Sequence, residues 1–184
     1  FRKVRKTTMI RTLDGKSPKI DPTAFVSEFA YVVGDVELGP NSSIWPGVVI
    51  RADSGKIQIG AGSNVQDNSV LHADADAEIG DNVTIGHGVV CHARMIGNGS
   101  LIGNGATLND GVTLGENCLV AAGSTVVDNA EFVQNSLIRG TPAKAIGKIR
   151  PRHSELMQKA AAFYISQIAI YKSSDLGDSI TSIT

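Results

Sequence analysis

The 184-residue chain has room for one domain with an appendage, and its formal net charge of −1 excludes a bulk attraction to nucleic acid or to an anionic membrane. Aromatic residues make up only 5% of the chain while 20 residues are glycine, which argues against a conventional thick core. The sequence has no run of 18 apolar residues, so it predicts no membrane span. Two cysteines, Cys91 and Cys118, predict no disulfide framework, so we expect a reducing, cytoplasmic location.

The chain opens with the basic stretch FRKVRKTTM, which carries no repeat. We interpret it as a targeting remnant or, in preference, as sequence upstream of a start at Met9. The sequence therefore predicts an N-terminal extension over residues 1–12.

From Ile20 to Val126, apolar residues recur at every sixth position, and eighteen positions, all aliphatic except Cys91, keep this phase with only three register shifts. A period of six fits neither an α-helix nor simple strand alternation. It indicates an all-β solenoid, a parallel β-helix in which three hexapeptides close one triangular coil and the aliphatic residue points inward. A β-sandwich would need turn signals at intervals of about 8–12 residues, which are absent. We place this β-helix at residues 13–150.

After about residue 140 the repeat ends. The segment TPAKAIGKIRP is expected to be a linker, and RHSELMQKAAAFYISQIAIYK predicts an amphipathic helix from about Ser154 to Lys172, with Ser154 as its N-cap. Its packing face is predicted from 3–4 spacing to contain Leu156, Ala160, Phe163, Tyr164, Gln167 and Tyr171. We expect residues 151–173 to pack back along the β-helix and residues 174–184 to form a flexible tail.

The three register shifts fall between Ile50 and Ile96, within the stretches RADSGK, HADADA and HARM. Insertions in a solenoid become loops on one face, which is often the binding face. This region also contains three of the four histidines of the chain.

One coil, lengthened by two inserted residues, separates His72 from His92, so both are predicted to point outward at the same place on successive coils, about 4.8 Å apart. His87 precedes His92 by five residues, roughly 16 Å of extended chain, with a corner between them. We expect His87 to complete a site on an adjacent subunit. Three neutral imidazoles with an open fourth position are typical of a catalytic zinc, whereas single outward histidines are usually solvated.

The stretch RADSGKIQIGAGSNVQDNSVLH, followed by IGHGVVCH, closely resembles the γ-class carbonic anhydrases and their bacterial relatives over about Ile20 to Pro151. The resemblance implies a left-handed parallel β-helix with a C-terminal helix, and a homotrimer with three metal sites between subunits. Each site would take His72 and His92 from one chain and His87 from the next. The implied activity is reversible hydration of carbon dioxide to bicarbonate, with Zn²⁺ as cofactor and Fe²⁺ or Co²⁺ as alternatives.

The resemblance also assigns roles to polar residues of these motifs. Arg51 and Asp67 resemble a pair that bridges subunits near the metal, with a structural salt bridge as the alternative. Asp53 resembles a carboxylate of the interface and its water network, with a surface loop position as the alternative.

Three further residues resemble groups that contact the reactants. Gln66 resembles the residue that orients the metal-bound hydroxide, and Asn64 the residue that helps to position carbon dioxide; the alternative for both is a corner ladder of amides. Tyr164 resembles a tyrosine that reaches the pocket, and its alternative is helix packing.

The sequence departs from the family pattern at two places that concern proton export. Ser54 stands where established members carry a glutamate. Established members also carry a long acidic loop after the first histidine, whereas this chain has only the short stretch HADADAE. Asp74, Asp76 and Glu78 are either proton shuttles or a solvated acidic turn.

Two other functions remain open at this point. The fold also occurs in acyltransferases that use acyl-coenzyme A, and GTPAK occurs in both groups, although a transferase needs one histidine base and not three ligands. A metal-binding relative with little or no hydration activity is the other alternative, since fold alone cannot choose.

Overall fold

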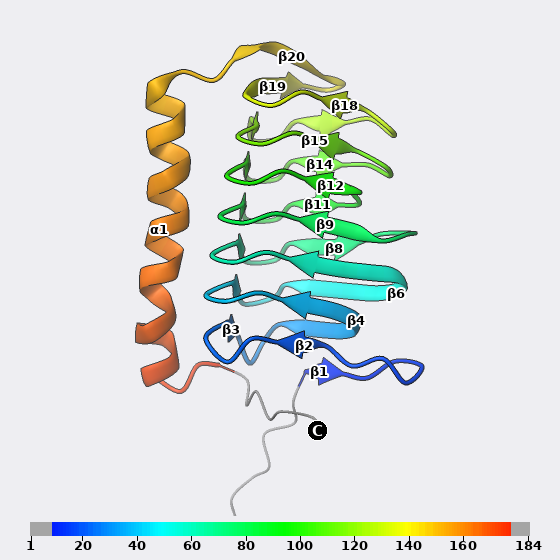
Figure 1. Cartoon of the computed structure of the whole chain (residues 1–184), viewed down its shortest axis with the longest axis vertical. Coiled ribbons are helices and arrows are strands. Elements are labelled where there is room, and N and C mark those ends of the chain that lie inside the picture. The colour runs from blue at the N-terminus through cyan, green and yellow to red at the C-terminus, as the bar shows by residue number, and fades with distance from the viewer. Residues whose placement is uncertain (1–8, 178–184) are drawn as a thin grey trace, which may run out of the picture.

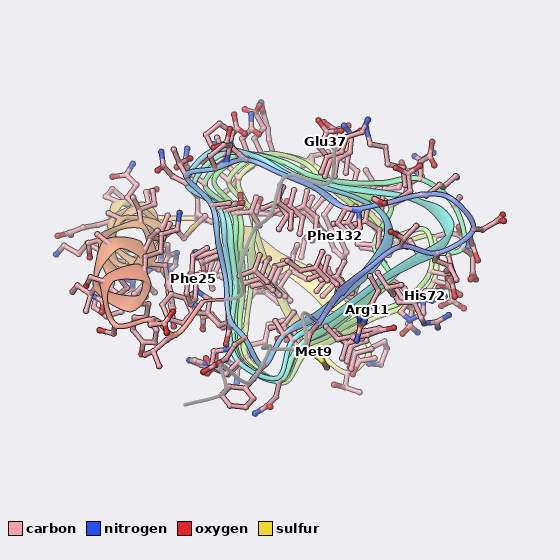
Figure 2. All side chains as sticks on the ribbon, turned by 90° about the horizontal axis from the view of Figure 1, so that it is seen from below. Met9, Arg11, Phe25, Glu37, His72 and Phe132 are labelled. Carbon is pink, nitrogen blue, oxygen red and sulfur yellow. The ribbon has the colours of Figure 1, made fainter. Side chains whose placement is uncertain are left out.

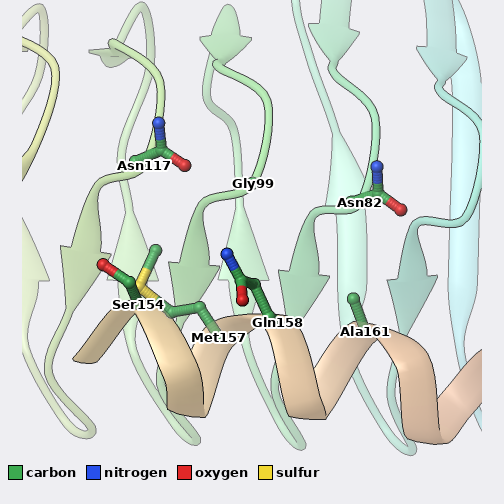
Figure 3. Close-up of a pocket in the computed structure, with 7 residues that line it drawn as sticks. All are labelled: Asn82, Gly99, Asn117, Ser154, Met157, Gln158 and Ala161. Carbon is green, nitrogen blue, oxygen red and sulfur yellow. The ribbon is translucent and has the colours of Figure 1, made fainter. Parts of the chain in front are cut away.

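The computed structural model describes residues 9–177 and shows parallel coils stacked along one axis, with a single helix, α1 (Pro151–Ser173), along the outside (Figure 1). Viewed along the axis, the coils superpose as a three-sided prism with α1 against one side (Figure 2). The predicted fold class, a left-handed parallel β-helix with a C-terminal helix, is confirmed. Residues 1–8 and 178–184, which include most of the predicted extension and tail, lie outside the described residues.

Each side of the prism is a ladder of short strands. The helix-covered face consists of β3 (Phe25–Val26), β5 (Ser43–Ile44), β7 (Asn64–Val65), β10 (Thr84–Ile85), β13 (Leu101–Ile102), β16 (Leu119–Val120), β19 (Ser136–Gly140) and β20 (Ala143–Lys148). The second face contains β1 (Ile10–Arg11), β8 (Val70–His72), β11 (Val90–Cys91), β14 (Thr107–Leu108) and β17 (Thr125–Val126). The third face contains β2 (Lys19–Ile20), β9 (Ala77–Ile79), β12 (Met95–Ile96), β15 (Thr113–Leu114) and β18 (Glu131–Phe132).

Two longer strands, β4 (Tyr31–Leu38) and β6 (Val49–Ile59), run around the corner and belong to both the second and the third face. β4 passes the corner at Gly34, which has a φ of +87° and lies so close to the backbone of Ala52 on β6 that a Cβ atom would collide with it. Glycine is therefore required where these two chains turn together.

The core is the set of inward columns that the six-residue period predicts. Of the eighteen predicted positions, all are buried except Ile20, which is partly buried and packs against the rest. Ile102, for example, lies in register with Ile85 on one neighbouring coil and with Val120 on the other. Each coil therefore buries its aliphatic side chains only by stacking on the next.

Cys91 is one of these inward residues, and burial raises the pKa of its thiol to about 11. In the unfolded chain the thiol ionises near pH 9.0. Between pH 9 and pH 11 the Cys91 thiol is ionised in the unfolded chain but still protonated in the folded chain, so rising pH favours unfolding. The free energy of unfolding should therefore be unaffected by this thiol below pH 9 and should fall by up to about 3 kcal/mol per chain as the pH approaches 11. Urea unfolding at about pH 8 and about pH 10.5 should show a larger loss for the wild type than for Cys91→Ala. Equal losses in the two proteins would contradict the assignment.

The end of the prism differs from its prediction. Where a linker was expected, β20 pairs antiparallel with β19 and covers the last parallel strand of the helix-covered face. An uncovered strand edge exposes unpaired backbone groups, so the chain folds back to pair them. At the other end, β1 pairs with β4 from Ile10 onward, so the ladder begins inside the segment expected to be an extension.

α1 begins earlier than predicted. Pro151 occupies its first turn and Arg150, not Ser154, is the N-cap, with the Arg150 N–H donating to Nδ1 of His153 at 3.1 Å. Proline suits the first helical position because it has no N–H to leave unpaired.

The buried face of α1 is also shifted from the prediction. Met157, Ala161 and Ile168 are the buried residues, whereas Leu156 and Phe163 are 55% and 56% exposed. Apolar residues lie on more than one side of this helix, so the spacing alone did not select the buried side. In the described residues, no helix is both long and apolar enough to cross a membrane.

An aromatic cluster fixes the C-terminal half of α1 on the prism. Trp45 lies between Phe25, Tyr164 and Tyr171, with ring centroids 5.3, 5.1 and 4.7 Å away, and Ile168 completes the cluster. Such tilted and edge-to-face contacts add to the stabilisation from burial. The cluster therefore holds Tyr164 at a fixed place beside the helix-covered face.

Candidate metal centre

His72 and His92 form a pair on adjacent coils of the second face. Leu71 and Cys91, the residues before them, are directly in register. The two imidazole rings lie 5.0 Å apart between centroids and meet edge to face, at 75°. In Figure 2, His72 projects outward on the side of the prism away from α1. The two histidines therefore lie side by side on successive coils, as counting the hexapeptides predicts.

His87 lies at a different corner. It follows β10 and the glycine at position 86, where the helix-covered face meets the second face. Within residues 9–177 of one chain, no three histidine, cysteine, aspartate or glutamate side chains are grouped so that they could hold a metal ion. One chain thus supplies the histidine pair and, separately, His87.

His72 is held by a carboxylate of β6. Its Nε2 lies 2.8 Å from Oδ1 of Asp53, and Arg51, in register with His72, pairs with the other oxygen of Asp53. The hydrogen bond from His72, followed by the Arg51 guanidinium, holds the pKa of Asp53 below its ordinary value. Asp53 is therefore an ionised acceptor at neutral pH.

The other two histidines have carboxylate partners as well. Nδ1 of His87 lies 3.1 Å from Asp67, and Nδ1 of His92 lies 2.8 Å from Asp110. Within the chain Asp67 thus contacts His87, while Arg51 contacts Asp53, so the structure does not bring Arg51 and Asp67 together in one chain.

A carboxylate on one ring nitrogen is the usual support of a metal-binding histidine, because it fixes the ring and leaves the other nitrogen for the metal. The nitrogens that have no carboxylate partner, and so could bind a metal, are Nδ1 of His72, Nε2 of His87 and Nε2 of His92. The donor set of three supported imidazoles fits Zn²⁺.

Asn64 and Gln66 lie on the helix-covered face, beside the corner of His87. Gln66 donates from Nε2 to Oδ1 of Asn64 at 3.1 Å, and Asn64 donates from Nδ2 to the hydroxyl of Thr84 at 3.0 Å. All three side chains are buried. The amides therefore have fixed orientations, and Thr84 is a supporting residue that the sequence analysis did not identify.

Tyr164 extends from α1 toward the same corner. Burial and the negative charge of Asp67 raise the pKa of its phenol. The phenol therefore keeps its proton at neutral pH and can donate a hydrogen bond. Gln66, Asp67, His87 and Tyr164 make up a group that we call the His87 corner.

In the acidic loop after His72, Asp76 has a structural contact. Its carboxylate accepts the backbone N–H of Lys56 at 2.9 Å, which ties the loop to β6 on the neighbouring coil. This contact favours the turn interpretation of Asp76 over the shuttle interpretation.

Comparison with known proteins connects this geometry to a family. A family model described as bacterial transferase hexapeptide (six repeats) matches residues 95–128. The chain is 37% identical over 177 residues to gamma carbonic anhydrase 2, mitochondrial, of Arabidopsis thaliana, and 34% identical over 184 residues to a carbonic anhydrase of Geobacillus kaustophilus, covering 91% of the latter. The chain belongs to the γ-carbonic anhydrase family.

The alignments cover 92% and 89% of this chain, so the γ-carbonic anhydrase resemblance drawn from its motifs is confirmed over nearly its whole length. The chain spans about three fifths of the Arabidopsis protein, 63% of its length. Among solved structures, a hexapeptide transferase family protein from Anaplasma phagocytophilum superposes with a TM-score of 0.84 at 37% identity, over 87% of this chain and 96% of that one. The γ-carbonic anhydrase fold is thus shared with proteins named as transferases.

Proposed function

We propose that the protein is a homotrimeric metalloenzyme that catalyses the reversible hydration of carbon dioxide to bicarbonate and a proton, with Zn²⁺ as its cofactor. The observation that carries this proposal is the histidine pair, with ring centroids 5.0 Å apart and a carboxylate on each ring. Membership of the γ-carbonic anhydrase family supports it.

The second face supports the trimer. It separates the histidine pair from the His87 corner, and its outward side carries an apolar row in ladder register: Tyr31, Val49, Val70 and Val90. Val90 is 41% exposed in the single chain. A threefold axis beside this face would cover the row and set the histidine pair of one chain against the His87 corner of the next.

When bound between these groups, the metal supplies a Lewis acid that makes a water molecule acidic enough to be deprotonated near neutral pH. The protein residues orient the reactants. Gln66 and Asn64 present amides fixed by their mutual hydrogen bond and by Thr84, and the phenol of Tyr164 is a hydrogen-bond donor. Asp53 stays ionised and accepts from His72. Fixed donors and acceptors of this kind lower the reorganisation cost of a charged transition state.

The proton that hydration releases must reach solvent. Ser54 cannot carry it, and Asp76 is bonded to the backbone of β6. Asp67 is already paired with Nδ1 of His87, so the exposed Asp74 and Glu78 of the acidic loop are the remaining candidates to carry the proton outward. Slow proton export is the expected limit on turnover.

Metal content and stopped-flow hydration of carbon dioxide test the proposal together. We expect the Zn²⁺-loaded protein to bind one metal ion per chain and to hydrate carbon dioxide faster than the uncatalysed reaction in the same buffer. His72→Ala should lose both the bound metal and the rate increase. His153→Gln is the matched control, because His153 lies at the start of α1 and bonds the Arg150 backbone. A metal-loaded wild type that hydrates no faster than buffer would contradict the assigned reaction.

An acyltransferase using acyl-coenzyme A is the second candidate, supported by the transferase family model and the Anaplasma structure. Calorimetric titration with acetyl-coenzyme A discriminates the two, since a carbonic anhydrase needs no such site. A metal-binding protein without hydration activity would bind Zn²⁺ but fail the stopped-flow test.

We place the protein in the cytoplasm because Cys91 and Cys118 are both unpaired and buried, which suits a reducing compartment. The Arabidopsis relative is named as mitochondrial.

A further inference from the structure

We infer that Asp110 is the positioning residue of His92: its carboxylate holds the proton on Nδ1 and so directs Nε2 toward the metal. The inference rests on the proposed metal site. Oδ1 of Asp110 lies 2.8 Å from Nδ1 of His92, while the His92 side chain is 30% exposed and that of Asp110 is 58% exposed.

Asp110 reaches His92 because it lies one coil further along the prism. Cys91 and Leu108 are in register, and the His92 N–H donates to the carbonyl of Leu108 at 2.8 Å. The carbonyl of Asp110 in turn accepts the N–H of Asn129 at 2.7 Å. The backbone on both sides of the contact is therefore fixed by the ladder.

The turn after Asp110 fixes its direction. Gly111 has a φ of +71°, and a Cβ atom there would collide with the side-chain oxygen of Asn129. Only glycine satisfies both conditions readily. The carboxylate is thus presented by a turn with little freedom.

A neutral imidazole has one N–H, and its position decides which nitrogen can bind a metal. The carboxylate of Asp110 accepts from Nδ1 of His92, which leaves a lone pair on Nε2. Asp53 contacts the opposite nitrogen, Nε2, of His72. The pair therefore offers one nitrogen of each type from rings that meet at 75°. Loss of Asp110 would release the His92 ring and allow the wrong tautomer.

Asp128 provides a matched control. It follows Val126, which is in register with Leu108, and so occupies the place of Asp110 one coil further from the histidines. Like Asp110 it is an exposed aspartate, and its neighbour on the coil below is Asp110 and not a histidine. Asp128→Ala removes the same charge and the same atoms without removing a histidine contact.

The experiment measures Zn²⁺ affinity by competition with a chromophoric chelator, using the full chain, in Asp110→Ala, Asp110→Asn and Asp128→Ala. Loss of an outer-sphere partner typically weakens metal binding about 10- to 100-fold. We expect that loss in Asp110→Ala, a smaller loss in Asp110→Asn, which keeps an acceptor oxygen, and wild-type affinity in Asp128→Ala. Equal melting temperatures of the two alanine variants would show that the difference is not one of folding.

A second measurement does not need the metal. Two-bond ¹H–¹⁵N correlation spectra of the metal-free protein report the tautomer of each histidine. His92 should carry its proton on Nδ1 in the wild type and in Asp128→Ala, and should shift toward Nε2 in Asp110→Ala. If the wild type binds metal but Asp110→Ala matches Asp128→Ala in both Zn²⁺ affinity and His92 tautomer, the role of Asp110 is wrong and the proposed function stands. A wild type that binds no metal overturns the proposed function, while the tautomer still decides the role of Asp110.

Discussion

Mixed trimers assembled from His72→Ala and His87→Ala chains are expected to recover about one metal ion each, although neither variant binds metal by itself. Each homotrimer of one variant lacks one ligand at every site. In a mixed trimer, one interface joins a His87→Ala chain, which keeps the histidine pair, to a His72→Ala chain, which keeps His87. That interface has all three ligands, so one site of three is rebuilt.

The expectation follows from the separation of the two groups in the single chain, where the pair lies at the end of the second-face strands and His87 at their beginning. Metal content and hydration activity should recover together. Native mass spectrometry with one variant tagged confirms mixing, and sedimentation of the wild type should give three times the 19.3 kDa chain mass. Confirmed mixed trimers without recovered metal, or a monomer that binds one metal ion, would show that the site is not shared between chains.

Replacing Ile102 with alanine is expected to destabilise the protein by about 2–5 kcal/mol, the usual cost of truncating a buried aliphatic residue. Ile102 is 0% exposed and stacks between Ile85 and Val120 on the helix-covered face. Because each coil is stabilised mainly by its neighbours, the cavity weakens contacts on both sides at once.

Urea unfolding at one protein concentration measures this effect, since subunit association also contributes to stability. Thr113→Ala is the control: Thr113 lies on β15 next to Leu114, on the third face and away from the proposed subunit interface, and it points outward, so its loss should change stability by less than about 0.5 kcal/mol. If the two variants have the same free energy of unfolding, Ile102 does not point into the core and the six-residue register is wrong.

The period of six made most of the fold predictable, because a solenoid repeats one contact and the inward residue of each hexapeptide always meets the same neighbours. The same regularity placed His72 against His92, since counting hexapeptides is equivalent to counting coils. The buried side of α1 has no such repeat. Leu156 and Met157 are both apolar, yet only Met157 is buried; it lies beside the turns at Asn82 and Asn117, a contact that the spacing of apolar residues does not describe.

The supporting residues of the site were predictable in part. The coil after His92 has 17 residues because one residue is lost within HARM, so Cys91 pairs with Leu108 and coil counting places Asn109, not Asp110, in register with His92. The sequence therefore places Asp110 only near His92, one residue beyond the equivalent position. That it forms a hydrogen bond depends on the turn at Gly111, which spacing does not describe. The partner of Arg51 is Asp53 within the chain because both lie on the same long strand, β6, two residues apart.

The register between Leu71 and Cys91 has a consequence for how the site can vary between relatives. The two residues are paired even though the loop at positions 73–76 inserts two extra residues between their coils, because the ladder, and not the length of chain between them, sets their distance. A surface loop can double in length for about 0.6 kcal/mol. Loop length and metal geometry are therefore independent variables in this fold: a longer acidic segment can be grafted between the two coils to change proton traffic while His72 and His92 stay in place.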